Sequence, residues 1–343
     1  MMPFSSTHGL RDLSRIEVWR GSVVESVHRV SVAVVDASGE LRACSGDADL
    51  VAFARSAIKP LQALPLIELG VTDRYGLSER ELALCCASHS GEEYHTEAAR
   101  SILRKIGVDE TALACGPHAP FHEPSAAALS SSGVEPGRIH NNCSGKHAGM
   151  LALARCQGWP IAGYQQAAHP VQKLMLETVA RWTAMAEEEI PIAVDGCGVA
   201  TFALPLRRMA GAFARLAAAA RRGDAAPARI VEAMTRHPAY VAGSGRLCSA
   251  VMRAADGRLI AKTGAEGVYC AAVPGAELGV ALKVEDGAKR AAEPAVLAVL
   301  RALGLLSDDA MADLAEFASP TIRNTRGEVV GAIRPAIELQ PVA

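Results

Sequence analysis

The chain has 343 residues, half of them apolar, and a formal net charge of −2 at pH 7. This length allows one large domain or two modest ones with a sizeable core, and the near-neutral charge argues against a general nucleic-acid or membrane-surface role. No apolar stretch approaches the roughly 18–20 residues that cross a bilayer, and the N-terminus has no apolar signal core, so we expect a cytoplasmic protein.

The chain begins with strand patterns and then becomes helical. Residues 15–26 and 28–35 are rich in valine and serine, residues 36–40 form a turn, and residues 41–44 return as a strand. From Ser56 the apolar spacing is that of a helix, which Gly70 ends. Amphipathic helices then follow at residues 78–86, 92–106, 146–157, 171–188, 204–222 and 225–235.

Strand patterns return near the C-terminus. We predict a meander at residues 258–262, 268–273 and 278–285, a helix at residues 293–303 and a last hairpin at residues 321–339. Strands at both ends with helices between them favour an α/β fold. In it, residues 12–60 and 245–343 share one antiparallel sheet flanked by helices, and residues 61–244 form a mainly helical insertion that completes the active site.

Ser56 and Lys59 form a Ser-x-x-Lys motif at the start of a predicted helix. Residues three apart share a helix face, so the lysine amine can reach the serine hydroxyl and, when neutral, act as its base. The motif alone more often marks a helix cap followed by a surface lysine. A Lys-Thr-Gly segment at Lys262 favours the catalytic interpretation, because penicillin-binding proteins and β-lactamases have both motifs in this order. Their Ser-Asp-Asn element is absent.

Nine cysteines, an odd number, argue against a disulfide framework. Cys143 lies in an Asn-Asn-Cys-Ser-Gly-Lys-His segment, and Cys197 lies between two glycines. Two thiolates on different turns with a nitrogen donor nearby are typical of a zinc site. Spacing alone favours His147 as the nitrogen ligand, because Cys-x-x-x-His fits a helical turn and a lysine ligand must first lose a proton. Two buried cysteines without a metal are the alternative.

Residues 85–95 end one predicted helix and begin the next. Ser90 followed by Glu93 has the spacing of a capping box, which explains these two residues structurally. Ser88 and His89 have no such explanation, and a small hydroxyl at this place can line a pocket instead.

Six short segments of the chain occur in the order found in the Rhizobium-type L-asparaginases, also called the asparaginase II family, whose members contain zinc. The chain resembles this family from about residue 16 to residue 286. The resemblance implies a fold similar to those of serine β-lactamases and glutaminases, a homodimer and bound Zn²⁺. The matching segments are residues 17–21, 55–60, 87–92, 141–147, 195–198 and 262–267.

The resemblance also implies a reaction, the hydrolysis of L-asparagine to L-aspartate and ammonia. Ser56 is then the nucleophile and Lys59 its base, and Ser88 and Lys262 form a second serine–lysine pair. Backbone N–H groups at the helix start, together with Ser88, would stabilise the oxyanion.

The resemblance assigns the remaining residues to zinc and substrate. The family's zinc ligands match Cys143, Lys146 and Cys197, with solvent completing the set, so Lys146 replaces His147 as the expected nitrogen ligand. A carboxylate suits the α-ammonium group of the substrate, and a guanidinium suits its α-carboxylate. The residues implied to contact the substrate are Arg55, His147 and Asp195.

Two other functions remain open. A β-lactamase, a D-Ala-D-Ala peptidase or another amidohydrolase such as a glutaminase would share the serine–lysine motifs, although the missing Ser-Asp-Asn element and the missing export signal count against a cell-wall substrate. The non-enzymatic alternative is a zinc-stabilised protein that binds an amino acid without turnover. The partner expected in each case is a small molecule, and neither a nucleic acid nor a membrane.

Overall fold

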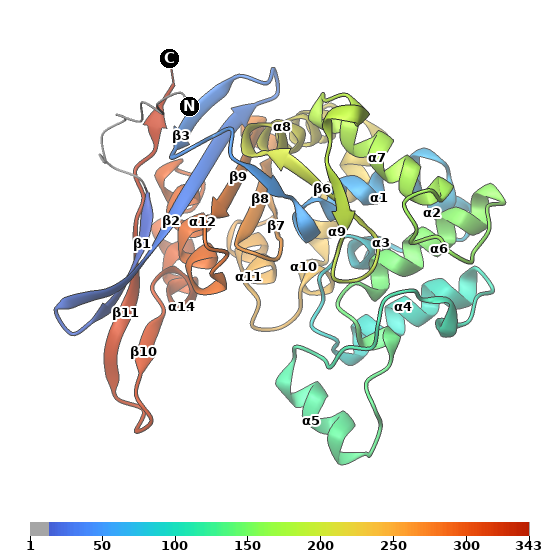
Figure 1. Cartoon of the computed structure of the whole chain (residues 1–343), viewed down its shortest axis with the longest axis horizontal. Coiled ribbons are helices and arrows are strands. Elements are labelled where there is room, and N and C mark those ends of the chain that lie inside the picture. Colours follow the sequence, from blue (N-terminus) through green and yellow to red (C-terminus); the bar gives the residue numbers. More distant parts are fainter. Residues whose placement is uncertain (1–13, 343) are drawn as a thin grey trace, which may run out of the picture.

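A nine-stranded antiparallel sheet is the main feature of the structure, a computed structural model that describes residues 14–342. Residues 12 and 13, predicted to begin the sheet region, lie outside the described residues. The strand order is β10-β11-β1-β2-β9-β8-β7, and β3 and β12 extend the sheet beside β2 (Figure 1). The strands are β1 (Arg15–Arg20), β2 (Val23–Asp36), β3 (Leu41–Ser45), β7 (Ile260–Thr263), β8 (Val268–Val273), β9 (Leu278–Val284), β10 (Thr321–Arg323), β11 (Val329–Ala336) and β12 (Gln340–Pro341).

Strands from the two ends of the chain pair with each other, as predicted. β1 lies between β2 and β11, and β2 pairs with β9 over its whole C-terminal half. The predicted strand 15–26 is two strands, because Gly21 adopts φ +56° in the turn between β1 and β2. The predicted C-terminal hairpin is β10 and β11, with Asn324 in its turn.

Helices cover both faces of the sheet, and the core lies between the sheet and the helices on each face. Residues 30–35 of β2 are all buried, which is typical of a strand packed on both faces. α8 (Leu206–Arg222) packs on β2, β8 and β9, and α12 (Lys289–Ala302) packs on β1, β9 and β11. Gly279 of β9 permits the close approach of α8, since a Cβ there would collide with the carbonyl oxygen of Ala210. The chain is therefore a mixed α/β protein of the predicted class.

A helical region lies between β4 and β7, on the right of Figure 1. It contains a second sheet, β4 (Val51–Phe53), β6 (Ala200–Pro205) and β5 (Ile192–Val194) in the order β4-β6-β5, which the sequence did not predict because two of these strands are only three residues long. Its helices are α1 (Lys59–Glu68), α2 (Val71–Arg74), α3 (Glu79–Cys85), α4 (Glu93–Lys105), α5 (Glu123–Ser131), α6 (Ser144–Gln157), α7 (Pro170–Thr183), α8, α9 (Ala225–Arg236), α10 (Pro238–Val241) and α11 (Leu247–Ala254). Two short helices, α13 (Asp308–Asp313) and α14 (Ala315–Ala318), follow α12.

The capping box lies on a different helix from the one predicted. Ser78 caps α3: its hydroxyl accepts from the Glu81 N–H at 3.3 Å, and the Glu81 carboxylate accepts from the Ser78 N–H at 2.6 Å. Ser90 instead donates to the carbonyl of Ala242 at 2.9 Å, and α4 begins after Glu92. The prediction for Ser90 was wrong because its buried hydroxyl finds a partner far away in the sequence.

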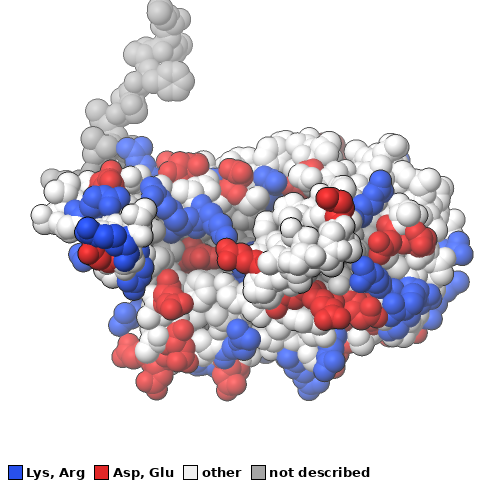
Figure 2. All heavy atoms as spheres, turned by 90° about the horizontal axis from the view of Figure 1, so that it is seen from below, with Lys and Arg blue, Asp and Glu red and all other residues white. Residues whose placement is uncertain are grey.

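In the described part of the chain, no helix combines the length and the apolar character that crossing a membrane requires. On the face shown in Figure 2, Lys and Arg side chains are interspersed with Asp and Glu side chains. This mixed face does not offer the broad basic surface that binding to a phosphate backbone requires. The cytoplasmic location stays a prediction.

Candidate active site

Ser56 lies on a sharp turn between β4 and α1. The turn is a short 3-10 helix (Arg55–Ile58) whose first residue has φ +49°, a left-handed conformation that is strained for a residue with a side chain. Two hydrogen bonds hold it: the Ala54 N–H donates to a carbonyl of β6 at 2.9 Å, and Arg55 Nε donates to Asp195 Oδ1 at 2.5 Å. The turn thereby presents the half-buried Ser56 at the wall of a cavity.

The Lys-Thr-Gly segment at the end of β7 packs directly against this turn. A Cβ on Gly264 would lie 2.9 Å from the Ala54 carbonyl oxygen and 3.2 Å from the Ala57 amide nitrogen, so only glycine fits without moving the turn. Ala265, which follows Gly264, lines the same cavity as Ser56. Among the described residues, neither the Ser56 N–H nor the Ala265 N–H has a hydrogen-bond acceptor. Two free backbone donors near a serine hydroxyl can stabilise an oxyanion.

Lys59 is fully buried, and its amine makes three hydrogen bonds. They go to Ala87 O at 2.5 Å, Ser88 Oγ at 3.0 Å and Cys143 Sγ at 3.1 Å. A charged lysine has three N–H donors, so all of them are taken. The direct contact with Ser56 that the motif spacing predicted is therefore not made, because tertiary partners orient the amine towards Ser88.

Lys262 reaches the same serine from β7. Its Nζ lies 2.9 Å from Ser88 Oγ and 2.8 Å from Thr263 O, and the side chain is fully buried. Burial lowers the pKa of Lys262 to about 7, although the nearby Cys248 thiol opposes the change, and the charge of Lys59 adds to it. A neutral Lys262 can accept the Ser88 hydroxyl proton while Lys59 donates to the same oxygen. The predicted Ser88–Lys262 contact is present, and Ser88 is held between two amines.

A thiol pair lies next to Lys59. The Cys143 thiol hydrogen-bonds that of Cys197, whose sulfur lies 3.1 Å from Lys146 Nζ. This hydrogen bond and the charge of Lys146 lower the pKa of Cys197 to about 5 despite its burial, whereas donating the bond and burial raise the pKa of Cys143 to about 12. Burial alone would lower the pKa of Lys146, but Cys197, Cys143 and Asp195 outweigh it and raise that pKa. These shifts favour the thiolate form of Cys197 beside the charged amine of Lys146.

The tautomer of His147 follows from its hydrogen bonds. The Ala114 N–H donates to Tyr164 Oη at 2.8 Å, and this leaves the tyrosine proton free to point to His147 Nδ1, 2.6 Å away, which is the arrangement we assign. In this assignment Nδ1 is an acceptor and Nε2 carries the hydrogen. Burial and the charge of Lys146 lower the pKa of His147 to about 3, so the ring stays neutral. Its buried Nε2 has no partner among the described residues, so the ring offers one N–H donor to a bound ligand.

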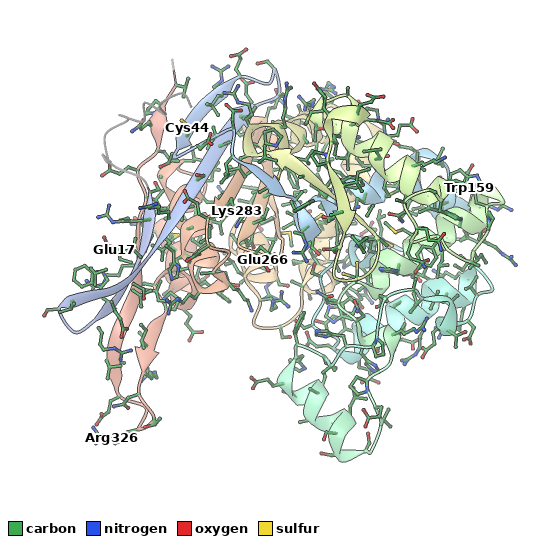
Figure 3. All side chains as sticks on the ribbon, viewed as in Figure 1. Glu17, Cys44, Trp159, Glu266, Lys283 and Arg326 are labelled. Atoms are coloured by element: carbon green, nitrogen blue, oxygen red, sulfur yellow. The ribbon has the colours of Figure 1, made fainter. Side chains whose placement is uncertain are left out.

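A cavity of about 750 Å³ opens from Ser56 and Ser88. Its walls come from residues 121–124, residues 244–248, the turn at residues 263–267 and the first turns of α12. Glu266 of that turn lies beside Lys283 in Figure 3, and the Lys283 amine donates to its carbonyl at 2.7 Å. The residues predicted to contact the substrate do not line this cavity; these are Arg55, His147 and Asp195.

The predicted site residues fall into two neighbouring groups, joined by Lys59, which contacts both Ser88 and Cys143. The first group surrounds the hydroxyl of Ser88, and the second surrounds the thiol pair. The first group contains Lys59, Ser88 and Lys262, with Ser56 on the wall of the same cavity, and the second contains Arg55, Cys143, Lys146, His147, Asp195 and Cys197.

Sequence reasoning missed two residues of the site. Ala265 directly follows the Lys-Thr-Gly motif, so the motif's position on a strand end could have indicated its backbone N–H. Tyr164 lies in the loop between α6 and α7, 17 residues beyond His147, and no spacing pattern connects the two.

Comparisons with known proteins identify a family. The model of the L-asparaginase II family matches residues 16–335. No curated protein matches the chain. The structure of Mglu matches with 18% identity and a TM-score of 0.37, over 82% of this chain and 68% of that one.

Two further solved structures match at the same level. A provisionally named β-lactamase from Bacteroides dorei DSM 17855 matches with 14% identity and a TM-score of 0.38, over 85% of this chain and 93% of that one. Unliganded simvastatin synthase LovD from Aspergillus terreus matches with 12% identity and a TM-score of 0.37, over 84% and 94%. At these TM-scores the likeness supports no conclusion about activity, and the α/β class rests on the chain's own sheet and helices.

Proposed function

This chain belongs to the L-asparaginase II family, and we propose that it is an L-asparaginase, which hydrolyses L-asparagine to L-aspartate and ammonia. Family membership supports an amidohydrolase. The observation that carries the proposed asparaginase activity is the Ser88 hydroxyl, which is held between two buried lysine amines and lines the same cavity as Ser56. Such an arrangement can take a proton from a serine and return it to a leaving amine.

Ser56 is the nucleophile in this proposal. Its Oγ attacks the side-chain amide carbon of asparagine, and the N–H groups of Ser56 and Ala265 stabilise the oxyanion. The strained Arg55 supports this role, because backbone strain of this kind is often found at functional sites. Water then hydrolyses the aspartyl ester and frees Ser56.

The chain Lys59–Ser88–Lys262 takes up and returns the proton. The Ser56 proton passes to the Ser88 oxygen as the Ser88 proton passes to neutral Lys262, and Lys59 holds the Ser88 oxygen in place. The same path in reverse protonates the leaving ammonia. Because the pKa of Lys262 is lowered to about 7, we expect turnover to fall as the pH drops below about 7 and the amine becomes charged.

The α-groups of asparagine fit the ion pair of Arg55 and Asp195. Their side chains are 24% and 9% exposed, so the pair is largely removed from water. An amino-acid zwitterion can replace their mutual contact, with its α-carboxylate on Arg55 and its α-ammonium on Asp195. The Nε2–H of His147 then supplies a neutral donor to the substrate.

Zinc fits the thiol pair, and we propose that Cys143, Lys146 and Cys197 hold it. Two thiols in contact, one of them a thiolate, converge with an amine nitrogen 3.1 Å from one sulfur. In residues 14–342 no three His, Cys, Asp or Glu side chains are arranged to hold a metal, and the proposed set differs from such a cluster by its lysine, which must lose a proton to bind. When bound, the ion would supply a Lewis acid that orients the substrate.

The test is ammonia release from L-asparagine by the wild type, Ser56→Ala and Ser88→Ala, with L-glutamine in parallel. We expect rapid release by the wild type and its loss in both variants, with unchanged melting temperatures. Near-normal turnover by Ser56→Ala would show that another group is the nucleophile.

Other results of the same assay identify the alternatives. Faster release from glutamine indicates a glutaminase, since one methylene group changes selectivity by only about 1–3 kcal/mol in an apolar pocket. Cleavage of a chromogenic cephalosporin without ammonia release indicates a β-lactamase. Calorimetric binding of asparagine without turnover indicates a binding protein.

A further inference from the structure

The cavity beside Ser56 is larger than the hydrolysis of asparagine requires. Its volume of about 750 Å³ lies in the upper part of the range, roughly 300–1,000 Å³, of pockets that enclose drug-sized ligands. Ser56 and Ser88 line the cavity, and most of its wall comes from other segments of the chain. The leaving group of asparagine is ammonia, which occupies little of this space.

The place where the α-carboxylate and α-ammonium groups of the substrate bind decides which end of the substrate faces the cavity. Arg55 precedes Ser56 in the turn and binds Asp195, which lies 3.4 Å from the Cys197 sulfur, and neither Arg55 nor Asp195 lines the cavity. Because Ser56 lines the cavity and Arg55 and Asp195 do not, the proposed binding of the α-groups at Arg55 and Asp195 would direct the amide nitrogen towards the cavity. A substituent on that nitrogen therefore extends into the cavity.

Two cationic side chains of the cavity wall have no carboxylate partner among the described residues. Arg246 Nη1 donates to Ser90 Oγ at 3.2 Å, and the guanidinium lies 5.5 Å from the centre of the Phe121 ring. Lys289 lies in the first turn of α12, one turn before Glu293. Burial raises the pKa of Glu293 against the charges of Lys289 and Arg246. The cavity wall also contains Glu123 and Glu266, and Arg246 and Lys289 are the side chains of this wall that suit a ligand carboxylate.

We propose that the enzyme also cleaves β-aspartyl amides whose leaving amine carries a carboxylate, such as an amino acid linked through its α-nitrogen, with Arg246 and Lys289 binding that carboxylate. This inference rests on the proposed function, since the nucleophile and the two steps are the same. Ser56 Oγ bonds to the β-carbonyl carbon, the C–N bond breaks, and the amine leaves with a proton delivered through Ser88. Water then attacks the ester, gives its proton to the same chain, and releases aspartate.

The test compares three substrates: L-asparagine, β-L-aspartyl-glycine, and the same dipeptide with the carboxylate of its glycine converted to an amide. We expect the wild type to cleave the first two, and to cleave the amidated dipeptide with lower kcat/KM than the free acid. Arg246→Met should lower kcat/KM for β-aspartyl-glycine about 10-fold, the usual effect of losing one charge-assisted hydrogen bond, and leave asparagine within about 2-fold. Lys289→Met, at an exposed position, should act in the same direction with less risk to folding.

The other outcomes of this assay distinguish a failure of the inference from a failure of the proposed function. Cleavage of asparagine but not of β-aspartyl-glycine overturns the inference and leaves the proposed function standing. If Arg246→Met lowers kcat/KM equally for asparagine and for β-aspartyl-glycine, the α-carboxylate of the substrate binds in the cavity. That result also overturns the inference. Cleavage of none of the three overturns the proposed function itself.

Discussion

Replacing Lys262 by methionine tests whether burial holds its amine near neutrality. The side chain is 0% exposed, and its pKa falls from 10.5 to about 7, a difference of about 3.5 units. At about 1.4 kcal/mol per unit, folding with this amine charged below pH 7 costs roughly 5 kcal/mol. Methionine is similar in length and carries no charge, so Lys262→Met removes this cost.

The hydrogen bonds of Lys262 to Ser88 and Thr263 act in the opposite direction, at about 1–1.5 kcal/mol each. The variant should therefore be roughly 2 kcal/mol more stable than the wild type at about pH 6. Between about pH 7 and 10.5 the unfolded chain holds a proton on Lys262 that the folded chain lacks. Wild-type stability then rises by up to about 1.4 kcal/mol per pH unit, and the advantage of the variant disappears by about pH 9.

Urea unfolding of both proteins at about pH 6, 7, 8 and 9 measures this difference. Lys173→Met, at an exposed position of α7, is the matched control and should follow the wild type. Parallel profiles for Lys262→Met and the wild type, or a variant that is less stable at about pH 6, would refute burial as the cause of the lowered pKa.

Three further substitutions test the site geometry. Ser88→Ala should lower kcat for asparagine about 100-fold or more by breaking the proton path, and an undiminished kcat would contradict that role. Tyr164→Phe should raise the KM for asparagine about 10-fold, because His147 loses the hydrogen-bond partner of its Nδ1. An unchanged KM in steady-state kinetics would count against a role of His147 in substrate binding. Gly264→Ala should lower kcat about 100-fold by displacing the turn at Ala54, and full activity with a normal melting temperature would show that the turn adapts.

Structural features were best predicted from the sequence where the backbone conformation requires a particular residue type. Gly264 is needed because a side chain would meet the Ala54 carbonyl, and it stands in the motif that identified Lys262. The pairing of the two chain ends was also predictable, since strand patterns at both ends need partners. The order of β1 between β2 and β11 depends on non-local packing and could not be read from local spacing.

The hydrogen-bond partners of the site residues could not be predicted from spacing. Ser56 and Lys59 are three residues apart, yet Lys59 binds groups from the end of α3 and the start of α6, which only the tertiary fold brings together. The hydroxyl of Ser90 likewise finds its partner in the loop before α11. Bound zinc and the homodimer stay predictions.

Covalent trapping of the nucleophile tests the central claim most directly. An asparagine analogue with a diazomethyl ketone in place of the side-chain amide would be incubated with the protein, and the modified peptide would be identified by mass spectrometry. We predict one label per chain, on Ser56, with protection by L-asparagine and no label in Ser56→Ala. A label on Ser88 or on a cysteine, still blocked by asparagine, would contradict the account.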